Sequence, residues 1–119
     1  MSGTTFTTKV AAVVVAAGAS RRMSAIKQLL PWKNTTLLGY VIKQLKEAGA
    51  THVFLVLGAH QAEILKQVDT SHVSIIYNKD WSEGMGTSIA VASNFIKEQQ
   101  LDFEGILVAT CDQPLISLN

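Results

Sequence analysis

Residues 10–18 read Val-Ala-Ala-Val-Val-Val-Ala-Ala-Gly, and the class of fold can be inferred from this stretch and the segments around it. Residues 10–16 are apolar without alternation, which is typical of a parallel strand buried on both faces. Residues 17–33 then bring Gly, Ser, Pro and basic side chains, so they are expected to form a long loop. Lys9 before the apolar run also gives it the outline of a signal peptide, but the Val-rich run with one basic residue favours a strand. Loops this long inside compact domains are usually functional.

Outward from this strand, helices alternate with further strands. Strands are expected at residues 52–57, 73–77 and 105–109, and helices at 36–48, 61–68 and 87–99, with residues 78–86 as a second Gly-rich loop. The helix at 36–48 places Leu37, Val41 and Leu45 on one face. This alternation predicts an α/β fold with a Rossmann-like, doubly wound, mostly parallel sheet. Residues 1–9 are expected to form a flexible N-terminal arm, and residues 10–119 one α/β domain.

Composition excludes several classes of function. Of the 119 residues, 48% are hydrophobic and 16% charged, and the net charge is +1, so neither disorder nor a nucleic-acid or membrane partner is expected. No apolar run approaches the roughly 20 residues that span a bilayer. Cys111 is the only cysteine, which rules out a disulfide within the chain and predicts a cytoplasmic location.

The loop after the first strand combines two anion-binding features. The small residues Ala16, Ala17 and Gly18 allow backbone N–H groups to approach a phosphate closely. Arg22 and Lys27 add positive charges that can neutralise a triphosphate. The glycine patterns of P-loop kinases and of dinucleotide-binding oxidoreductases are both absent, which argues against those classes. The alternative is a solvated surface loop with no ligand.

The order of residues in this loop resembles a known family. MobA-like NTP transferases carry L-A-A-G-x-S-x-R-M-G-x-x-K-x-L-L-P, and residues 15–31 read V-A-A-G-A-S-R-R-M-S-A-I-K-Q-L-L-P. The resemblance implies that the backbone around Ala-Ala-Gly reads the base and holds the phosphates, while Arg and Lys hold the triphosphate. These roles are carried over to Ala16, Ala17, Gly18, Ser20, Arg22 and Lys27. Ser24 replaces the family glycine, which would strain the loop if that position needs a positive φ.

A second stretch is similar to the cytidylyltransferase branch of the family. That branch has N-x-x-W-x-x-G-M-x-x-S, and residues 78–88 read N-K-D-W-S-E-G-M-G-T-S. Ligand contact is therefore expected from Asn78, Gly84 and Ser88, near the N–H groups that begin a helix. The alternative is an ordinary helix N-cap at Thr87 or Ser88, with Trp81 and Met85 in the core. For Trp81 the core is the preferred interpretation.

Residues 111–114, Cys-Asp-Gln-Pro, match the family's A-D-Q-P at the end of the last strand. A carboxylate at this place suits Mg²⁺, so Asp112 is predicted to be a metal ligand. The alternative is an Asx turn before Pro114.

The resemblance implies a Mg²⁺-dependent nucleotidyltransferase. The phosphate of a molybdopterin-type acceptor would attack the α-phosphorus of CTP and release pyrophosphate, with Arg22, Lys27 and Asp112 as catalytic residues. Another phosphorylated acceptor and a non-catalytic nucleotide- or cofactor-binding module remain open. Family members continue beyond the D-Q-P strand, so residues 10–119 are expected to be an incomplete nucleotide-binding domain that lacks the acceptor half and is inactive alone. Pyrophosphate release by this chain would contradict that expectation. An exposed sheet edge would also allow self-association into a homo-oligomer.

Overall fold

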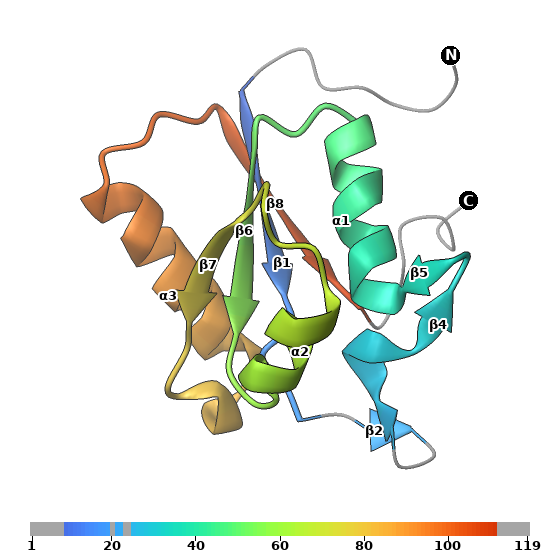
Figure 1. Cartoon of the computed structure of the whole chain (residues 1–119). Coiled ribbons are helices and arrows are strands. Elements are labelled where there is room, and N and C mark those ends of the chain that lie inside the picture. Colours follow the sequence, from blue (N-terminus) through green and yellow to red (C-terminus); the bar gives the residue numbers. More distant parts are fainter. Residues whose placement is uncertain (1–8, 20, 23–24, 112–119) are drawn as a thin grey trace.

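The main sheet has four parallel strands. The computed structural model describes residues 9–19, 21–22 and 25–111 (Figure 1). The strands β1 (Val10–Val15), β6 (His52–Leu57), β7 (Ser74–Tyr77) and β8 (Gly105–Thr110) lie in the order β7-β6-β1-β8. All three pairings are parallel, with β1 between β6 and β8. The predicted α/β sheet is confirmed, and of the predicted arm at residues 1–9 only Lys9 is described.

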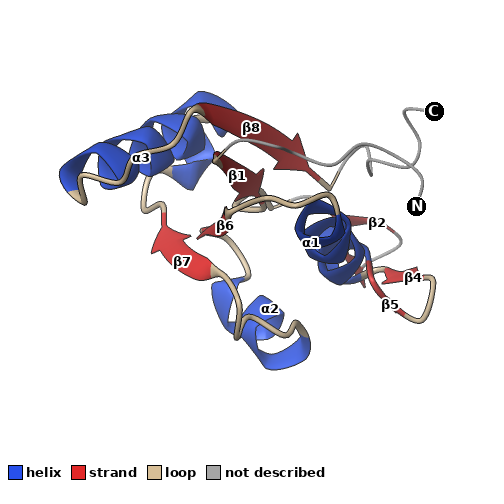
Figure 2. Cartoon of the chain, turned by 90° about the horizontal axis from the view of Figure 1, so that it is seen from above, coloured by secondary structure: helices blue, strands red, loops and turns tan. Residues whose placement is uncertain are grey.

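Helices cover both faces of this sheet. The helices α1 (Leu37–Glu47) and α2 (Gln61–Gln67) lie on one face, and α3 (Met85–Glu98) lies on the other (Figure 2). Each face has its own apolar cluster. Leu38, Leu45 and Leu55 belong to the cluster under α1 and α2, whereas Phe54 and Ile96 belong to the cluster under α3. The sheet is therefore doubly wound, as predicted.

The unbroken apolar run of β1 follows from its central position. Ala12 and Val14 pack into the cluster under α1, while Ala11 and Val13 pack into the cluster under α3. All four side chains are at most 2% exposed, so neither face of the strand tolerates a polar residue. Burial on both faces replaces the alternation of a half-exposed strand.

The segment that follows β1 is more ordered than the predicted loop at residues 17–33. It contains the strands β2 (Arg21–Arg22), β3 (Ala25–Ile26) and β4 (Pro31–Trp32) and the 3-10 helix η1 (Lys27–Leu29). Two antiparallel ladders form: β2 pairs with β3, and β4 pairs with β5 (Thr35–Thr36). The turn between β4 and β5 consists of Lys33 and Asn34, both with positive φ, which is the backbone of a tight two-residue hairpin. Ladders of two residues are too short to leave a periodic pattern in the sequence.

Strand β8 lies at an edge of the described sheet and pairs with β1 alone among the described strands. On its α3-facing side, Ile106 is 50% exposed and Val108 is 40% exposed, because α3 packs over β1 and β6 instead. Self-association through this edge stays a prediction. Within the described residues, no helix has the length and apolar character needed to cross a membrane.

Candidate functional site

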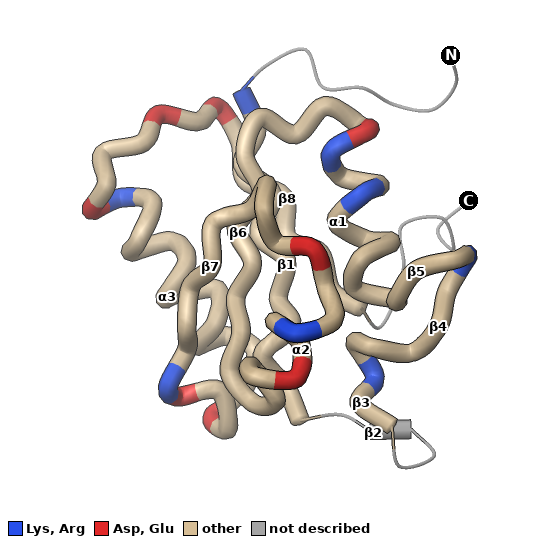
Figure 3. The backbone as a smooth tube through the Cα atoms, in the orientation of Figure 1, with Lys and Arg blue, Asp and Glu red and all other residues tan. Residues whose placement is uncertain are grey.

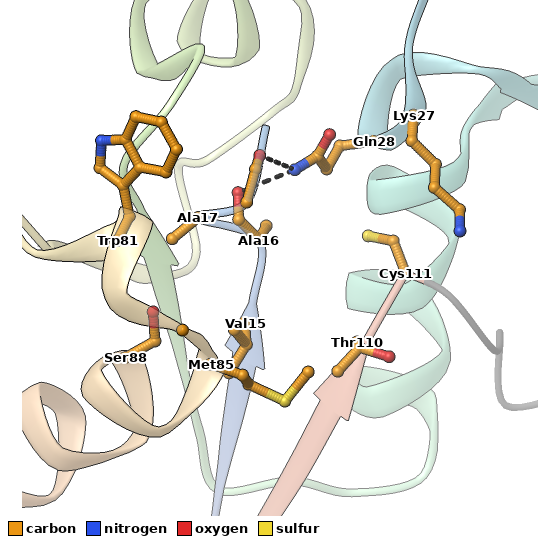
Figure 4. A pocket seen from close by; sticks show the side chains of 12 residues that line it. Val15, Ala16, Ala17, Lys27, Gln28, Trp81, Met85, Ser88, Thr110 and Cys111 are labelled. Carbon is orange, nitrogen blue, oxygen red and sulfur yellow. Dashed lines mark hydrogen bonds between the residues drawn. The ribbon is translucent and has the colours of Figure 1, made fainter. Parts of the chain in front are cut away.

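A cavity of about 220 Å³ opens where the chain leaves β1 and β8 (Figure 4). Strands β6 and β7 lie on one side of β1, and strand β8 lies on the other side. The cavity therefore lies where the strand order reverses. Ligands of doubly wound sheets bind at this point, outside the carboxyl ends of the strands. The cavity is lined by Val15, Ala16, Ala17, Gly18, Lys27, Gln28, Trp81, Gly84, Met85, Ser88, Thr110 and Cys111.

Two motifs far apart in the sequence contribute predicted site residues to this cavity. Its wall includes Ala16, Ala17 and Gly18 from the end of β1, Lys27 from η1, and Gly84 and Ser88 from the start of α3. Arg22 lies in β2, and its side chain is not described. Ser20, Ser24 and Asp112 lie outside the described residues. Cys111, the residue before Asp112, does line the cavity.

The turn after β1 is fixed by backbone hydrogen bonds to the neighbouring strand and its following turn. Ala16 N–H donates to the Val56 carbonyl over 2.9 Å, and Ala59 N–H donates to the Ala17 carbonyl over 3.0 Å. A Cβ atom added to Gly18 would meet no atom within 4 Å. Gly18 thus leaves open space beside a fixed backbone, and phosphate binding by this turn stays a prediction.

Gln28 is a buried polar residue of the site that the sequence patterns did not identify. Its side chain is 4% exposed, and Nε2 donates to the carbonyls of Ala16, over 3.0 Å, and Gly18, over 3.1 Å. In the family pattern this position is unspecified, between the Lys and the Leu-Leu-Pro. A 3-10 helix of three residues carries no amphipathic period, so no sequence signal indicated that Gln28 points inward.

Asn78 lies behind the cavity wall and supports the start of α3. It is fully buried and is absent from the cavity lining. Its Nδ2 donates to Thr87 Oγ1 and Ser88 Oγ, both over 2.9 Å, and its Oδ1 accepts from Asp80 N–H over 3.0 Å. Gly84 and Ser88 therefore line the cavity themselves, whereas Asn78 holds the first turn of α3 from behind through its hydrogen bonds to Thr87 and Ser88.

Trp81 and Met85 both line the cavity, although the sequence also allowed both to be core residues. Trp81, in the 3-10 helix η2 (Trp81–Glu83), is half-buried and packs against the cluster under α3 as well. A Cβ atom on Gly58 would lie 2.7 Å from Trp81 Cβ, so the absent side chain of Gly58 makes room for Trp81. Met85 is 47% exposed, and the core interpretation is wrong for it.

Gly84 joins η2 to α3 with φ +117°, a conformation that L side chains rarely adopt. Replacing Gly84 with Ala is expected to lower the free energy of unfolding by about 1–2 kcal/mol, because the added Cβ strains the backbone. Gly86→Ala is the matched control: Gly86 lies in the first turn of α3, and nothing lies within 4 Å of its added Cβ. Alanine there should raise stability by about 0.5–1 kcal/mol. Urea unfolding of both variants checks this, and equal effects at the two positions would contradict it.

Among the described residues that line the cavity, Lys27 supplies the positive charge, whereas the wider surface carries charges of both signs. Acidic and basic positions are interspersed along the described chain (Figure 3). Within the described residues, no group of three or more His, Cys, Asp or Glu side chains could hold a metal ion. The predicted ligand Asp112 lies outside the described residues, so Mg²⁺ binding stays a prediction.

A second hollow, of about 450 Å³, lies between α1 and the segment that joins α2 to β7. Its rim includes Lys43, Lys46 and Asp69. Hydrogen bonds from the Ser71 hydroxyl and the Ser71 N–H lower the pKa of the exposed Asp69 carboxyl. No residue predicted for the site lines this hollow.

The fold and the cavity together define a doubly wound α/β protein with a cavity at its topological switch point, the place where such sheets bind ligands. Comparison with known families is more specific. Residues 12–119 match the MobA-like NTP transferase domain, and the chain belongs to this family.

Individual relatives carry more than one activity. The chain is 33% identical to nicotine blue oxidoreductase of Paenarthrobacter nicotinovorans, over 92% of this chain and 52% of that protein. It is also 33% identical to molybdenum cofactor cytidylyltransferase of Escherichia coli, over 67% of this chain and 42% of that protein. A nucleotidyl transferase from Methanothermobacter superposes with a TM-score of 0.75 at 25% identity, over 89% of this chain and 51% of the other. The chain thus spans about half the length of the curated relatives named here.

Proposed function

We propose that this chain binds CTP in the cavity between the ends of β1 and β8, as the nucleotide-binding part of a cytoplasmic, Mg²⁺-dependent cytidylyltransferase for a molybdopterin-type acceptor. One observation carries the proposal. Residues predicted from two separate motifs, at 16–27 and 84–88, line the same cavity at the switch point of the sheet. Solvated surface loops without a common ligand would not be expected to line the same cavity.

The triphosphate is assigned to the side of the cavity formed by the turn after β1. Its small residues let the backbone approach phosphate oxygens, and Lys27 neutralises their charge. The helix α3, of 14 residues, begins at the opposite wall, so its N-terminus adds partial positive charge. Phosphoryl chemistry depends mainly on such positioning and charge neutralisation. Arg22 and Ser20 are proposed as further triphosphate contacts.

Mg²⁺ is assigned to Asp112. Support comes from the match of residues 111–114 to the family's A-D-Q-P and from Cys111, the residue before Asp112, which lines the cavity. Its carboxylate is the type of ligand that Mg²⁺ prefers, and bound Mg²⁺ would neutralise charge on the phosphate oxygens.

The choice of base and acceptor rests on sequence similarity. The motif at residues 78–88 resembles the cytidylyl branch, and the E. coli relative is a molybdenum cofactor cytidylyltransferase. The structure places Gly84, Met85 and Ser88 of that motif in the cavity wall. Another phosphorylated acceptor would use the same nucleotide site.

An oxidoreductase is the second candidate, because nicotine blue oxidoreductase matches 92% of this chain. Doubly wound oxidoreductases bind dinucleotides at the switch point, so the same cavity would hold the pyrophosphate of such a cofactor.

Calorimetric titration separates these candidates. Binding is measured instead of turnover because the chain spans about half of each relative. With Mg²⁺, CTP should bind about tenfold more tightly than GTP or ATP. Omitting Mg²⁺ or introducing Asp112→Ala should weaken CTP binding by about a hundredfold. Equal binding of the three nucleotides would refute the base assignment. Tighter binding of NADPH than of CTP would favour the oxidoreductase.

A further inference from the structure

We infer that Gln28 is a positioning residue that orients the N–H groups of the turn after β1 toward the phosphates. The inference rests on the proposed function, because it names the device that prepares that same site for its ligand. Gln28 is not itself required to touch the nucleotide.

Three consecutive carbonyls of this turn have hydrogen-bond donors from the protein. Gln28 Nε2 donates to the carbonyls of Ala16 and Gly18, so both hydrogens of one nitrogen are used. The carbonyl between them, that of Ala17, accepts from Ala59 N–H over 3.0 Å. Two sources, the Gln28 side chain from η1 (Figure 4) and the backbone after β6, therefore fix three successive peptide planes.

Fixing a carbonyl also fixes the N–H group on the same peptide plane. The described chain contains no cis peptide bond, and in a trans peptide the C=O and N–H groups point in opposite directions. The N–H groups of Ala17 and Ala19 therefore point away from Gln28, and that of Gly18 points away from Ala59. Rotation of one of these planes would present a carbonyl oxygen in place of an N–H group, and a carbonyl oxygen repels phosphate.

Glutamine has the chemistry that this position needs. The side chain is 4% exposed, and a buried charge there would carry a desolvation cost that a neutral amide avoids. One amide nitrogen supplies two donors in fixed directions, enough to bridge two carbonyls. Gln28 also follows Lys27 within η1. The hydrogen bonds of Gln28 to the turn therefore also fix the backbone of Lys27 beside the turn, at the cavity that Lys27 lines.

Gln28→Met tests the inference, since methionine has a similar length and no N–H donor. The second variant, Gln28→Glu, keeps the size and shape of the side chain. It replaces the donor nitrogen with a carboxylate oxygen, which repels the carbonyl oxygens of Ala16 and Gly18. Gln99→Met is the control, because Gln99 is exposed at the end of α3. Calorimetry with CTP and with inorganic triphosphate, both with Mg²⁺, is combined with amide ¹H–¹⁵N spectra of the ligand-free proteins.

Both Gln28 variants should bind CTP at least about tenfold more weakly than the wild type, with Gln99→Met unchanged. Inorganic triphosphate should also lose affinity by at least about threefold, because the N–H groups that contact phosphate are misoriented even where no base is present. The amide signals of Ala17, Gly18 and Ala19 should shift or broaden in the ligand-free variants. A folded variant with wild-type affinity and unchanged signals at these residues would overturn the inference. If the wild type binds neither ligand, the proposed function fails, and the amide signals alone decide whether Gln28 holds the turn.

Discussion

Lys27→Met should weaken the binding of CTP with Mg²⁺ about a hundredfold, the usual effect of removing one charged contact to a phosphate group. Lys27 belongs to the cavity wall beside the turn after β1, and it is the one basic residue among the described residues of that wall. Methionine keeps most of the aliphatic stem, so the substitution removes charge with little loss of packing. The wild-type affinity should also fall as salt is added, more steeply than that of the variant.

Lys97→Met provides the control for charge. Lys97 is exposed in the last turn of α3 and does not line the cavity, and its replacement changes the net charge of the chain by the same amount. Calorimetry should find its CTP affinity within about twofold of the wild type. An equal loss in both variants would mean that Lys27 acts through the net charge of the chain instead of through a contact.

Asn78→Leu should lower the free energy of unfolding by about 3 kcal/mol. The amide is fully buried, and it donates to the hydroxyls of Thr87 and Ser88 and accepts from Asp80 N–H. Leucine has a similar volume but satisfies none of these groups, and each buried polar group left without a partner costs about 1–3 kcal/mol. The loss should also loosen the start of α3 and so weaken CTP binding at the wall that Ser88 contributes.

Asn94→Leu is the matched substitution for urea unfolding. Asn94 lies in α3 and is exposed, so its replacement should change stability by no more than about 0.5 kcal/mol. A similar small effect at Asn78 would show that its three hydrogen bonds do not hold α3 in place.

The sequence predicted the main sheet because the burial of each strand leaves a clear pattern. β1 and β6 are apolar on both faces, and the predicted strand at 52–57 coincides with β6. The helices were also predicted to within about two residues, since their apolar residues recur on one face. Strands β2 to β5 could not be predicted, because each has two residues and exists only through its partner.

The same contrast holds for the site. The cavity-lining positions of Ala16, Gly18 and Lys27 could be predicted from local sequence, because small residues and a basic side chain are the features that the motif itself specifies. Gln28 and Asn78 act through contacts with residues about ten positions away, and their sequence surroundings do not show that they are buried. For a polar residue on a short connection, the sequence alone does not show whether its side chain contacts a ligand or forms hydrogen bonds inside the protein.

The most direct test of the central claim is to map where the nucleotide binds. Titration of the ¹⁵N-labelled chain with CTP and Mg²⁺ should shift the amide signals of Gly18, Lys27, Gly84 and Ser88 most strongly, because these residues line one cavity. Signals of His72 and Val73, at the second hollow, should stay in place. Shifts confined to the second hollow, or no shifts in a folded chain at millimolar CTP, would contradict the assignment of the nucleotide site to the ends of β1 and β8.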